Sequence, residues 1–231
     1  MGYTTTFTGR VTVVPPLNGH EIDYLERFAG SCRMHRTKGP YFVDGGGHRG
    51  QDIEPDVLDG GRAAPPEQPG RWCGWVPSAD GSSLGWDGGE KFYDSAEWMA
   101  YLIDTFLRPG AAVDRERADP TAGRVQPEAF AHFTFDHTVS GVIEAEGEDE
   151  EEGRWRLEVR DNTVHVVRHC EQPGYDEVDP DTDPSEWGDA QWARFASLVR
   201  YDVAYVVRDG ELHEVDPADG QPAARRRAAA T

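Results

Sequence analysis

Residues 45–50, GGGHRG, match the G-x-G-x-x-G pattern of dinucleotide-binding loops. In those loops the glycines join a parallel strand to a helix, whose N-terminus receives the pyrophosphate. Here Pro55 would interrupt a helix that began at residue 51, and Asp52 and Glu54 would repel a phosphate group. The pattern therefore predicts a Gly-rich loop rather than a dinucleotide site.

The flanks of that loop are basic, although the whole chain carries a net charge of −20. Guanidinium and ammonium groups bind phosphate and carboxylate through charge-assisted hydrogen bonds. One hypothesis is that this segment holds an anionic, phosphate-bearing small ligand or docks an acidic partner segment. The alternative is that its cations pair with the chain's own carboxylates. The expected ligand-binding residues are Arg33, Arg36, Lys38, His48 and Arg49.

Aromatic residues gather in the stretch 72–101, around two short Trp-bearing runs. Large aromatic side chains are typical anchors of protein interfaces, because they fill well-packed pockets. Packing in the core is the alternative explanation for the same residues. The residues expected at a partner-binding surface are Trp72, Trp75, Trp86, Tyr93 and Trp98.

Three further patterns lack the context that their chemistry needs. Residues 81–85 match G-x-S-x-G, but a turn precedes the serine and no helix follows, so we expect a hairpin turn and not a nucleophile. His165 and His169 would lie roughly 13 Å apart along a strand, too far to share one metal ion. Glu144 and Glu146 would lie roughly 7 Å apart on one strand face, a spacing that acid–base catalysis can use, but alternate acids on a wet face are ordinary.

The acidic loop 176–186 begins like a calcium-binding loop, with aspartates at alternate positions from residue 179 to residue 183. The position that needs glycine holds Pro184, and the twelfth position holds Ala190 instead of a bidentate glutamate. A solvated loop is the expectation, and calcium binding there stays open. We expect no resident metal ion and no cofactor.

Two helices that would position these residues have clear signals. Asn18 and Glu21 have the spacing of a capping box before a helix over 18–29, in which apolar residues recur at helical intervals. Asp94 is expected to cap a second helix over 95–107.

The other expected elements are mostly strands and hairpins, marked by β-branched and aromatic runs with turn residues between them. A strand over 3–14 is expected to contain a bulge at Gly9. The remaining expected elements are hairpins over 72–86, 154–169 and 201–215, a strand over 130–146, a helix over 187–199, and loops over 31–71, 110–128 and 171–186.

Strands do not alternate with crossover helices, so the pattern predicts an α+β fold. We expect a mostly antiparallel sheet built from hairpins, with two or three helices packed on one face. Residues 1–170 would form the core domain, with the Gly/Pro-rich loop at 31–71. Residues 171–231 would add an acidic loop, a helix and a C-terminal hairpin to this core, with a frayed tail over 217–231.

Composition excludes some classes of function. A chain with 43 acidic and 23 basic residues is repelled by phosphate backbones and anionic membrane surfaces, so generic nucleic-acid binding is disfavoured. No apolar run approaches the ~18 residues that a membrane span needs. The three cysteines are odd in number and widely spaced, which predicts reduced thiols and a cytoplasmic location.

Several longer stretches carry a resemblance to a known family: GYTTTF at 2–7, RM at 33–34, WCGWVP at 72–77, WDGGEKFYDSAEWMAYLIDTFLRP at 86–109, GVIEAEGE at 141–148 and DNTV at 161–164. In this order they are similar to motifs of a family of small bacterial and bacteriophage proteins with no established activity or cofactor. The resemblance covers roughly residues 2–168. It departs in the longer stretch 110–140, and residues 172–231 have no counterpart. It implies a soluble intracellular domain, associated with phages, and carries over no functional residues.

We therefore expect a non-enzymatic cytoplasmic module that binds another protein through the Trp hairpin and the start of the helix over 95–107. The alternative is a small-ligand binder, or an enzyme, acting on an anionic compound held by the basic segment 33–49. The two hypotheses differ in the surface they use. The oligomeric state and the identity of the partner stay open.

Overall fold

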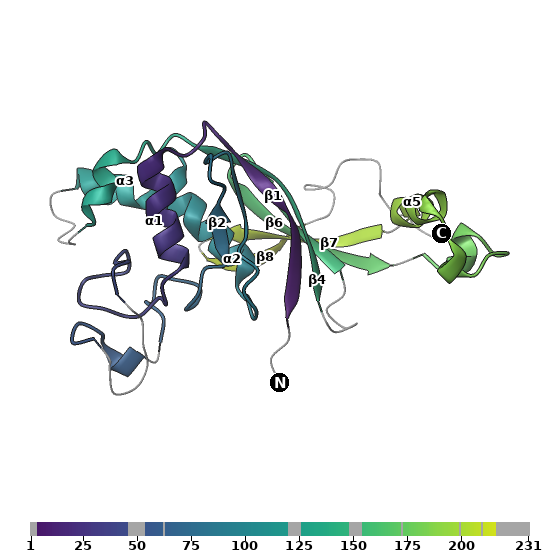
Figure 1. The fold of residues 1–231 in the computed structure, drawn as a ribbon, viewed down its shortest axis with the longest axis horizontal. Helices are drawn as coiled ribbons and strands as arrows, with labels where there is room; N and C mark the ends of the chain where they lie inside the picture. Colours follow the sequence, from purple (N-terminus) through teal and green to yellow (C-terminus); the bar gives the residue numbers. More distant parts are fainter. Residues whose placement is uncertain are drawn as a thin grey trace.

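The computed structural model describes residues 4–45, 54–61, 63–119, 126–147, 154–171, 173–198, 200–208 and 210–215. Its strands form one open antiparallel sheet in the order β2-β3-β1-β4-β5-β6-β7-β8 (Figure 1). The α+β class with an antiparallel sheet is thus confirmed. The strands are β1 Thr5–Val14, β2 Trp75–Pro77, β3 Ser83–Trp86, β4 Thr138–Gly147, β5 Arg154–Arg160, β6 Thr163–Glu171, β7 Arg200–Arg208 and β8 Glu211–Val215.

Hairpins build most of this sheet, as their turn residues predicted. β2 pairs with β3, β5 with β6, and β7 with β8. Asp161 and Asn162 both have positive φ, as the turn between two twisted strands requires. β1 joins the first hairpin to β4, and the pairing of β6 with β7 makes the C-terminal hairpin part of the same sheet. The tail 217–231 lies outside the described residues.

Gly9 does not form the predicted bulge. The register between β1 and β4 runs without interruption past Gly9, which lies opposite Ile143. Gly9 has a φ of +105°, and a Cβ at this position would lie 3.0 Å from the carbonyl oxygen of Val142. Glycine is needed here because the neighbouring backbone approaches too closely for a side chain.

The helix α1 (Gly19–Ala29) begins as its sequence predicted. The side chain of Asn18 accepts hydrogen bonds from the backbone N–H groups of His20 and Glu21, and the carboxylate of Glu21 accepts from the N–H of Asn18. This capping box satisfies N–H groups that a helix terminus otherwise leaves unpaired.

The helix α2 (Ser95–Leu102) continues into a π-helical turn, η2 (Ile103–Leu107), so the predicted span is confirmed. Asp94 lies at the predicted N-cap position, but its side chain makes no capping hydrogen bond. Its ψ of 44° departs from the extended backbone, ψ 170° at Asn18, that directs an N-cap side chain to the first turn.

Other elements differ in place from their predictions. The helix α3 (Ala112–Ala118) forms within the stretch predicted as a linker, and its buried residue is Val113, too little for a visible apolar stripe. The predicted strand over 130–146 begins later, at β4, because a 3-10 turn, η3 (Glu128–His132), precedes it. The remaining elements are η1 Asp59–Gly61, α4 Tyr175–Val178, η4 Pro184–Glu186 and α5 Asp189–Leu198.

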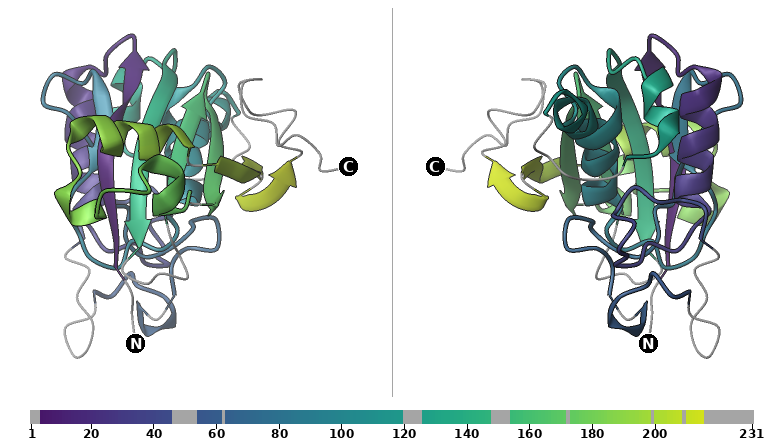
Figure 2. Two further views of the ribbon diagram at one scale, coloured as in Figure 1. Left: turned by 90° about the vertical axis from the view of Figure 1, so that its right-hand side faces the viewer. Right: turned by 90° about the vertical axis from the view of Figure 1, so that its left-hand side faces the viewer.

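The helices lie on both sides of the sheet. Figures 1 and 2 show α1, α2 and α3 on one side, and α4 and α5 on the other. The prediction that the helices share one face is therefore not confirmed. The main core fills the space between the sheet and α1 and α2, whereas Val178, Trp187 and Phe195 form a small separate cluster. Among the described helices, none has the length and apolarity to span a membrane.

Candidate functional site

The predicted ligand residue Arg33 lies in the interior, with 2% of its surface exposed. Its guanidinium donates hydrogen bonds to the carbonyl oxygens of Pro40, at 2.9 Å, and Phe42, at 2.6 Å. The same group lies 4.2 Å from the ring centroid of Phe28. Arg33 therefore shapes the loop that follows it and faces away from solvent.

Arg36 is also buried, and its charge is paired with carboxylates of the same chain. Its guanidinium is buried and forms ion pairs with Glu54 and, at 3.2 Å, with Asp56. The alternative that the basic segment pairs with the chain's own carboxylates thus describes Arg36. His48 and Arg49, the last two predicted ligand residues, lie outside the described residues.

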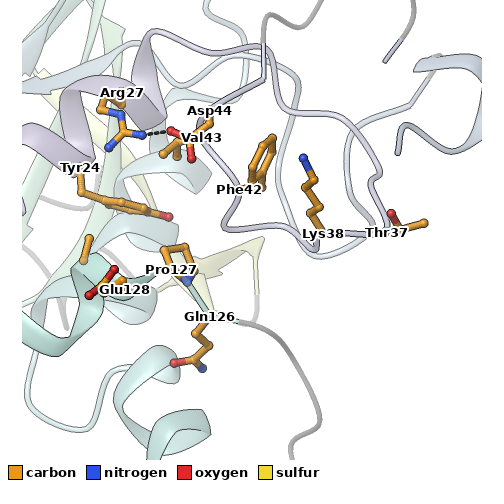
Figure 3. Close-up of a pocket in the computed structure, with 11 residues that line it drawn as sticks. Tyr24, Arg27, Thr37, Lys38, Phe42, Val43, Asp44, Gln126, Pro127 and Glu128 are labelled. Carbon is orange, nitrogen blue, oxygen red and sulfur yellow. Dashed lines mark ion pairs between the residues drawn. The ribbon is translucent and has the colours of Figure 1, made fainter. Parts of the chain in front are cut away.

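Lys38 is the predicted residue that reaches a cavity. A pocket of about 540 Å³ opens between α1, the loop 37–44 and residues 126–129 (Figure 3). The ammonium group of Lys38 lies 4.2 Å from the ring centroid of Phe42. The other lining residues are Tyr24, Arg27, Thr37, Val43, Asp44, Gln126, Pro127, Glu128 and Ala129.

The two cations that line this pocket differ in whether they form ion pairs. Arg27 forms ion pairs with Asp44 and, at 3.4 Å, with Asp23. Within the described part of the chain, Lys38 takes part in no ion pair. The pocket thus offers aromatic and aliphatic walls and one ammonium group without a carboxylate partner.

The sequence predicted Lys38 but missed the rest of the lining. Tyr24 lies on α1, and Pro127 and Ala129 lie at η3, more than a hundred positions along the chain from Tyr24. Their apolar character is ordinary for core residues, so no local pattern marked them. Their meeting depends on how η3 packs against α1.

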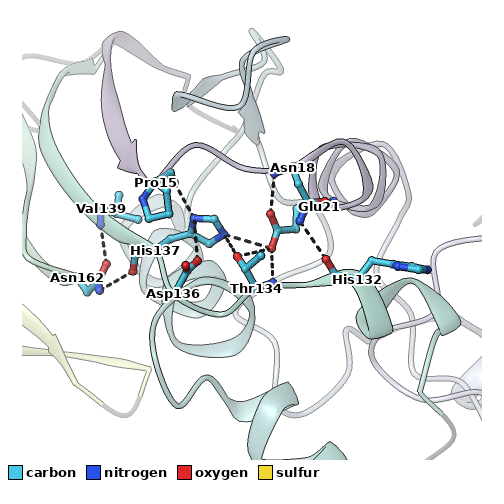
Figure 4. A network of polar contacts seen from close by, with 9 residues as sticks. All are labelled: Pro15, Asn18, Glu21, His132, Thr134, Asp136, His137, Val139 and Asn162. Carbon is cyan, nitrogen blue, oxygen red and sulfur yellow. Dashed lines mark hydrogen bonds and ion pairs between the residues drawn. The ribbon is translucent and has the colours of Figure 1, made fainter.

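A buried network holds α1 and η3 together (Figure 4). The carboxylate of Glu21 accepts hydrogen bonds from the backbone N–H of Thr134, at 2.8 Å, and lies 3.2 Å from His137 Nε2. His137 Nδ1 donates to the carbonyl oxygen of Pro15 at 2.7 Å. Since Asn18 also donates to the carbonyl of His132, the start of α1 is tied to the end of η3.

The network favours the charged form of both Glu21 and His137. Burial by itself opposes the charged form of Glu21, but hydrogen bonds from His137, Thr134 and Asn18 outweigh it and lower the pKa of the carboxyl. Burial likewise opposes the imidazolium of His137, and the hydrogen bonds to Glu21 and to the Pro15 carbonyl raise its pKa. The pair joins the start of α1 to the segment that follows η3, and α1 and η3 form two of the three sides of the Lys38 pocket.

The five predicted aromatic residues divide between core and surface. Trp75 and Trp98 are core residues, at 1% and 0% exposed, and Trp75 donates its indole N–H to the carbonyl of Ser95. Trp72 is 57% exposed and Tyr93 46%, whereas Trp86 is half-buried. The predicted surface thus narrows to Trp72, Trp86 and Tyr93.

Phe7 connects this surface to a second pocket. Its ring lies between 5.3 and 5.8 Å from the rings of Trp75, Trp86, Phe92 and Trp155. Phe92 and Trp155, together with Tyr93, line a pocket of about 350 Å³ at the start of α2. The exposed residue Tyr93 therefore lies at the mouth of a cavity.

The remaining candidate sites are those considered for metal binding and acid–base chemistry. Among the described residues, no cluster of three or more His, Cys, Asp or Glu side chains could hold a metal ion. Asp179 accepts a hydrogen bond from the backbone N–H of Asp181, and Asp183 accepts from the hydroxyl and the backbone N–H of Ser185. These hydrogen bonds lower the pKa of each carboxyl. Glu146 pairs with Arg154 on the exposed sheet face.

Comparison with known proteins adds no further constraint. No protein-family model, curated protein or solved structure matches the chain. The resemblance of residues 2–168 to bacterial and phage proteins stays a prediction. The function is therefore inferred from the two pockets and the exposed aromatic residues.

Proposed function

We propose that the protein binds a small amphipathic anion in the pocket beside Lys38. The observation that supports this proposal is the combination of an apolar cavity of about 540 Å³ with an ammonium group at its wall. Ligand pockets typically measure about 300–1,000 Å³ and combine apolar walls with a few polar groups that orient the ligand.

The ligand is expected to place its parts according to the lining. An aromatic or aliphatic body packs against Tyr24, Phe42 and Pro127, and a carboxylate or phosphate meets Lys38. Arg27 is held by Asp44 and contributes less to the attraction of an anion. Because Glu128 also lines the pocket, a ligand with several negative charges is disfavoured.

The test uses three ligands with one ring system: 1-naphthoate, 1-naphthyl phosphate and the neutral 1-naphthamide. Binding is measured by calorimetry and by thermal shift, since a ligand at a hundred times its Kd stabilises the protein by about 2.7 kcal/mol. We expect the singly charged naphthoate to bind more tightly than the amide, and naphthyl phosphate, nearly doubly charged at pH 7, to bind less tightly than naphthoate because Glu128 lines the pocket. Ala129→Phe, which places a ring in the cavity, should weaken all three ligands.

The chain provides a matched control, because it contains two lysines, Lys38 and Lys91, and Lys91 does not line the pocket. Lys38→Gln should weaken the anions about two- to five-fold, in line with the ~1 kcal/mol or less of an exposed ion pair, and should leave the amide unchanged. Lys91→Gln should change nothing. If Lys38→Gln and Lys91→Gln bind each ligand with the same affinity, Lys38 has no role in binding. If none of the three ligands binds the unchanged protein at millimolar concentration, the proposal is overturned.

A second candidate function is protein binding at the exposed aromatic surface, as expected from the sequence. The observation that supports this candidate is that Trp72 and Tyr93 are exposed. The three other tryptophans in the stretch 72–101 are buried or half-buried. A net charge of −20 favours a partner with a basic surface.

Affinity capture with single variants tests this candidate. Trp72→Ser and Tyr93→Ser should each lose a partner that the unchanged protein retains. Trp192→Ser is the control, since Trp192 is similarly exposed but lies on α5. A partner retained by all three variants would place the interaction elsewhere on the molecule.

A further inference from the structure

The smaller pocket, of about 350 Å³, lies where the first turn of α2 meets the sheet. Phe92 and Tyr93 enter it from the segment before α2, Trp155 from β5, and Leu212 from β8. Leu212 and Tyr93 are among the exposed large apolar residues, so the pocket opens to solvent. Its aromatic walls continue into the core through Phe7.

Two opposite charges line this pocket without neutralising each other. Glu97 is half-buried on the first turn of α2, and Arg168 lies directly across from Trp155 in the β5–β6 register. Within the described residues, no ion pair joins Glu97 to Arg168 or to another side chain. The guanidinium of Arg168 lies 5.4 Å from the ring centroid of Tyr205 and meets no carboxylate there.

Among the side chains that the structure describes, none supplies a compensating cation to the half-buried carboxylate of Glu97. Burial raises the pKa of Glu97, and the nearby Asp94 adds to the rise. Taking a charged group out of water costs free energy unless a partner replaces the lost solvation. A ligand ammonium group would supply that partner, and a ligand carboxylate would match the fork of the Arg168 guanidinium.

We infer that this pocket binds a zwitterion, namely a free amino acid with an apolar side chain. Its ammonium group pairs with Glu97, its carboxylate with Arg168, and its side chain lies against Trp155, Phe92 and Val166. Such a ligand carries no net charge, so it leaves the charge balance of the pocket unchanged. The inference is independent of the Lys38 pocket, which shares no lining residue with this one.

Calorimetry with L-phenylalanine and four analogues tests the inference. Phenethylamine lacks the carboxylate and 3-phenylpropionate lacks the ammonium group, and each should bind at least ten-fold more weakly than phenylalanine. Phenylalanine amide and N-acetylphenylalanine imitate the two ends of a peptide and should also bind at least ten-fold more weakly. If either of these two binds as tightly as phenylalanine, the site recognises a chain terminus and the inference is overturned.

Two variants assign the charges. Glu97→Gln should weaken phenylalanine at least five-fold and abolish its advantage over 3-phenylpropionate. Arg168→Gln should weaken it similarly and abolish its advantage over phenethylamine. Each loss must be selective, which separates charge recognition from a general loss of structure.

The controls are Glu90→Gln and Arg208→Gln, which remove the same charges outside the pocket and should leave every affinity unchanged. Circular dichroism and thermal unfolding of each variant confirm that it folds. Absence of phenylalanine, leucine and tryptophan binding at 10 mM, on the order of the weakest useful affinity, would overturn the inference. So would equal affinities of the unchanged protein for phenylalanine and both single-charge analogues.

Discussion

His137 and Glu21 form an ion pair in the interior, with His137 Nε2 3.2 Å from Glu21 Oε1 and side chains that are 1% and 0% exposed. Glu21 belongs to the capping box of α1, and His137 precedes β4. Thr134 donates to the same carboxylate from its backbone N–H. One carboxylate therefore completes a helix terminus and joins it to a segment distant in sequence.

Because of this pair, the free energy of unfolding should fall both at acidic pH and at basic pH. The pKa of Glu21 is lowered from 4.5, so its contribution is complete above pH 4.5 and is lost as the pH falls through the folded value. The pKa of His137 is raised from 6.5, so its contribution is complete below pH 6.5 and is lost as the pH rises through the folded value. The pair stabilises most between these two limits, and urea unfolding from about pH 3 to about pH 9 measures it.

The control for this prediction is His137→Gln, which removes the titrating imidazole. The variant should be less stable at all pH values and should lose the decline above pH 6.5. A decline as steep as that of the unchanged protein would show that another group titrates there.

Replacement of Arg33 by lysine should destabilise the protein by about 2–3 kcal/mol and also weaken ligand binding in the Lys38 pocket. A lysine cannot reproduce the planar fork that donates to both Pro40 and Phe42, so the carbonyl of Phe42 loses its donor, whereas that of Pro40 keeps the hydrogen bond from Gln68. Chemical denaturation and calorimetry with 1-naphthoate measure the two effects. Arg115→Lys is the matched control, since Arg115 is not buried and donates to a single carbonyl, and it should cost about 0.5 kcal/mol or less.

Gly81→Ala should destabilise the protein more than Gly88→Ala. Both glycines have positive φ, at 71° and 86°, so each alanine costs about 1–2 kcal/mol of backbone strain. A Cβ at Gly81 would lie 2.3 Å from the carbonyl oxygen of Leu17, whereas one at Gly88 would meet nothing within 4 Å. Thermal unfolding of the two variants gives the difference, and equal losses would mean that the Leu17 segment moves freely.

Cys73 should resist alkylation in the folded protein. Burial raises the pKa of its thiol to about 12, so at pH 8 about one molecule in ten thousand carries the reactive thiolate. Iodoacetamide labelling followed by peptide mass spectrometry should find Cys73 unmodified in buffer and modified in urea. Labelling in buffer at the rate of an unfolded peptide would contradict its burial.

The sequence alone was sufficient where the determining contacts are local. The capping box at Asn18 and Glu21, the spans of α1 and α2, and the hairpin turn at Asp161-Asn162 depend on hydrogen bonds and φ preferences within a few residues. Such features leave a pattern of residue types at fixed spacing. They also determined the α+β class, because hairpins without crossover helices lead to an antiparallel sheet.

Tertiary structure decided which residues of similar type and sequence position are buried and which are exposed. Arg33 and Lys38 belong to one basic segment, yet one is buried against backbone carbonyls and the other lines a pocket. Trp75 and Trp72 lie three positions apart, yet one is in the core and the other is exposed.

The physical reason is that burial and pocket formation depend on which distant segments pack together. The end of η3 and the segment after it meet the start of α1 through His132 and Thr134. Residues of α2, β5, β6 and β8 together line the pocket around Glu97 and Arg168. A sequence read along the chain contains the side chains of both pockets but not the contacts that bring them together. The capping residues and turns were therefore predictable from the sequence, whereas both candidate sites required the fold.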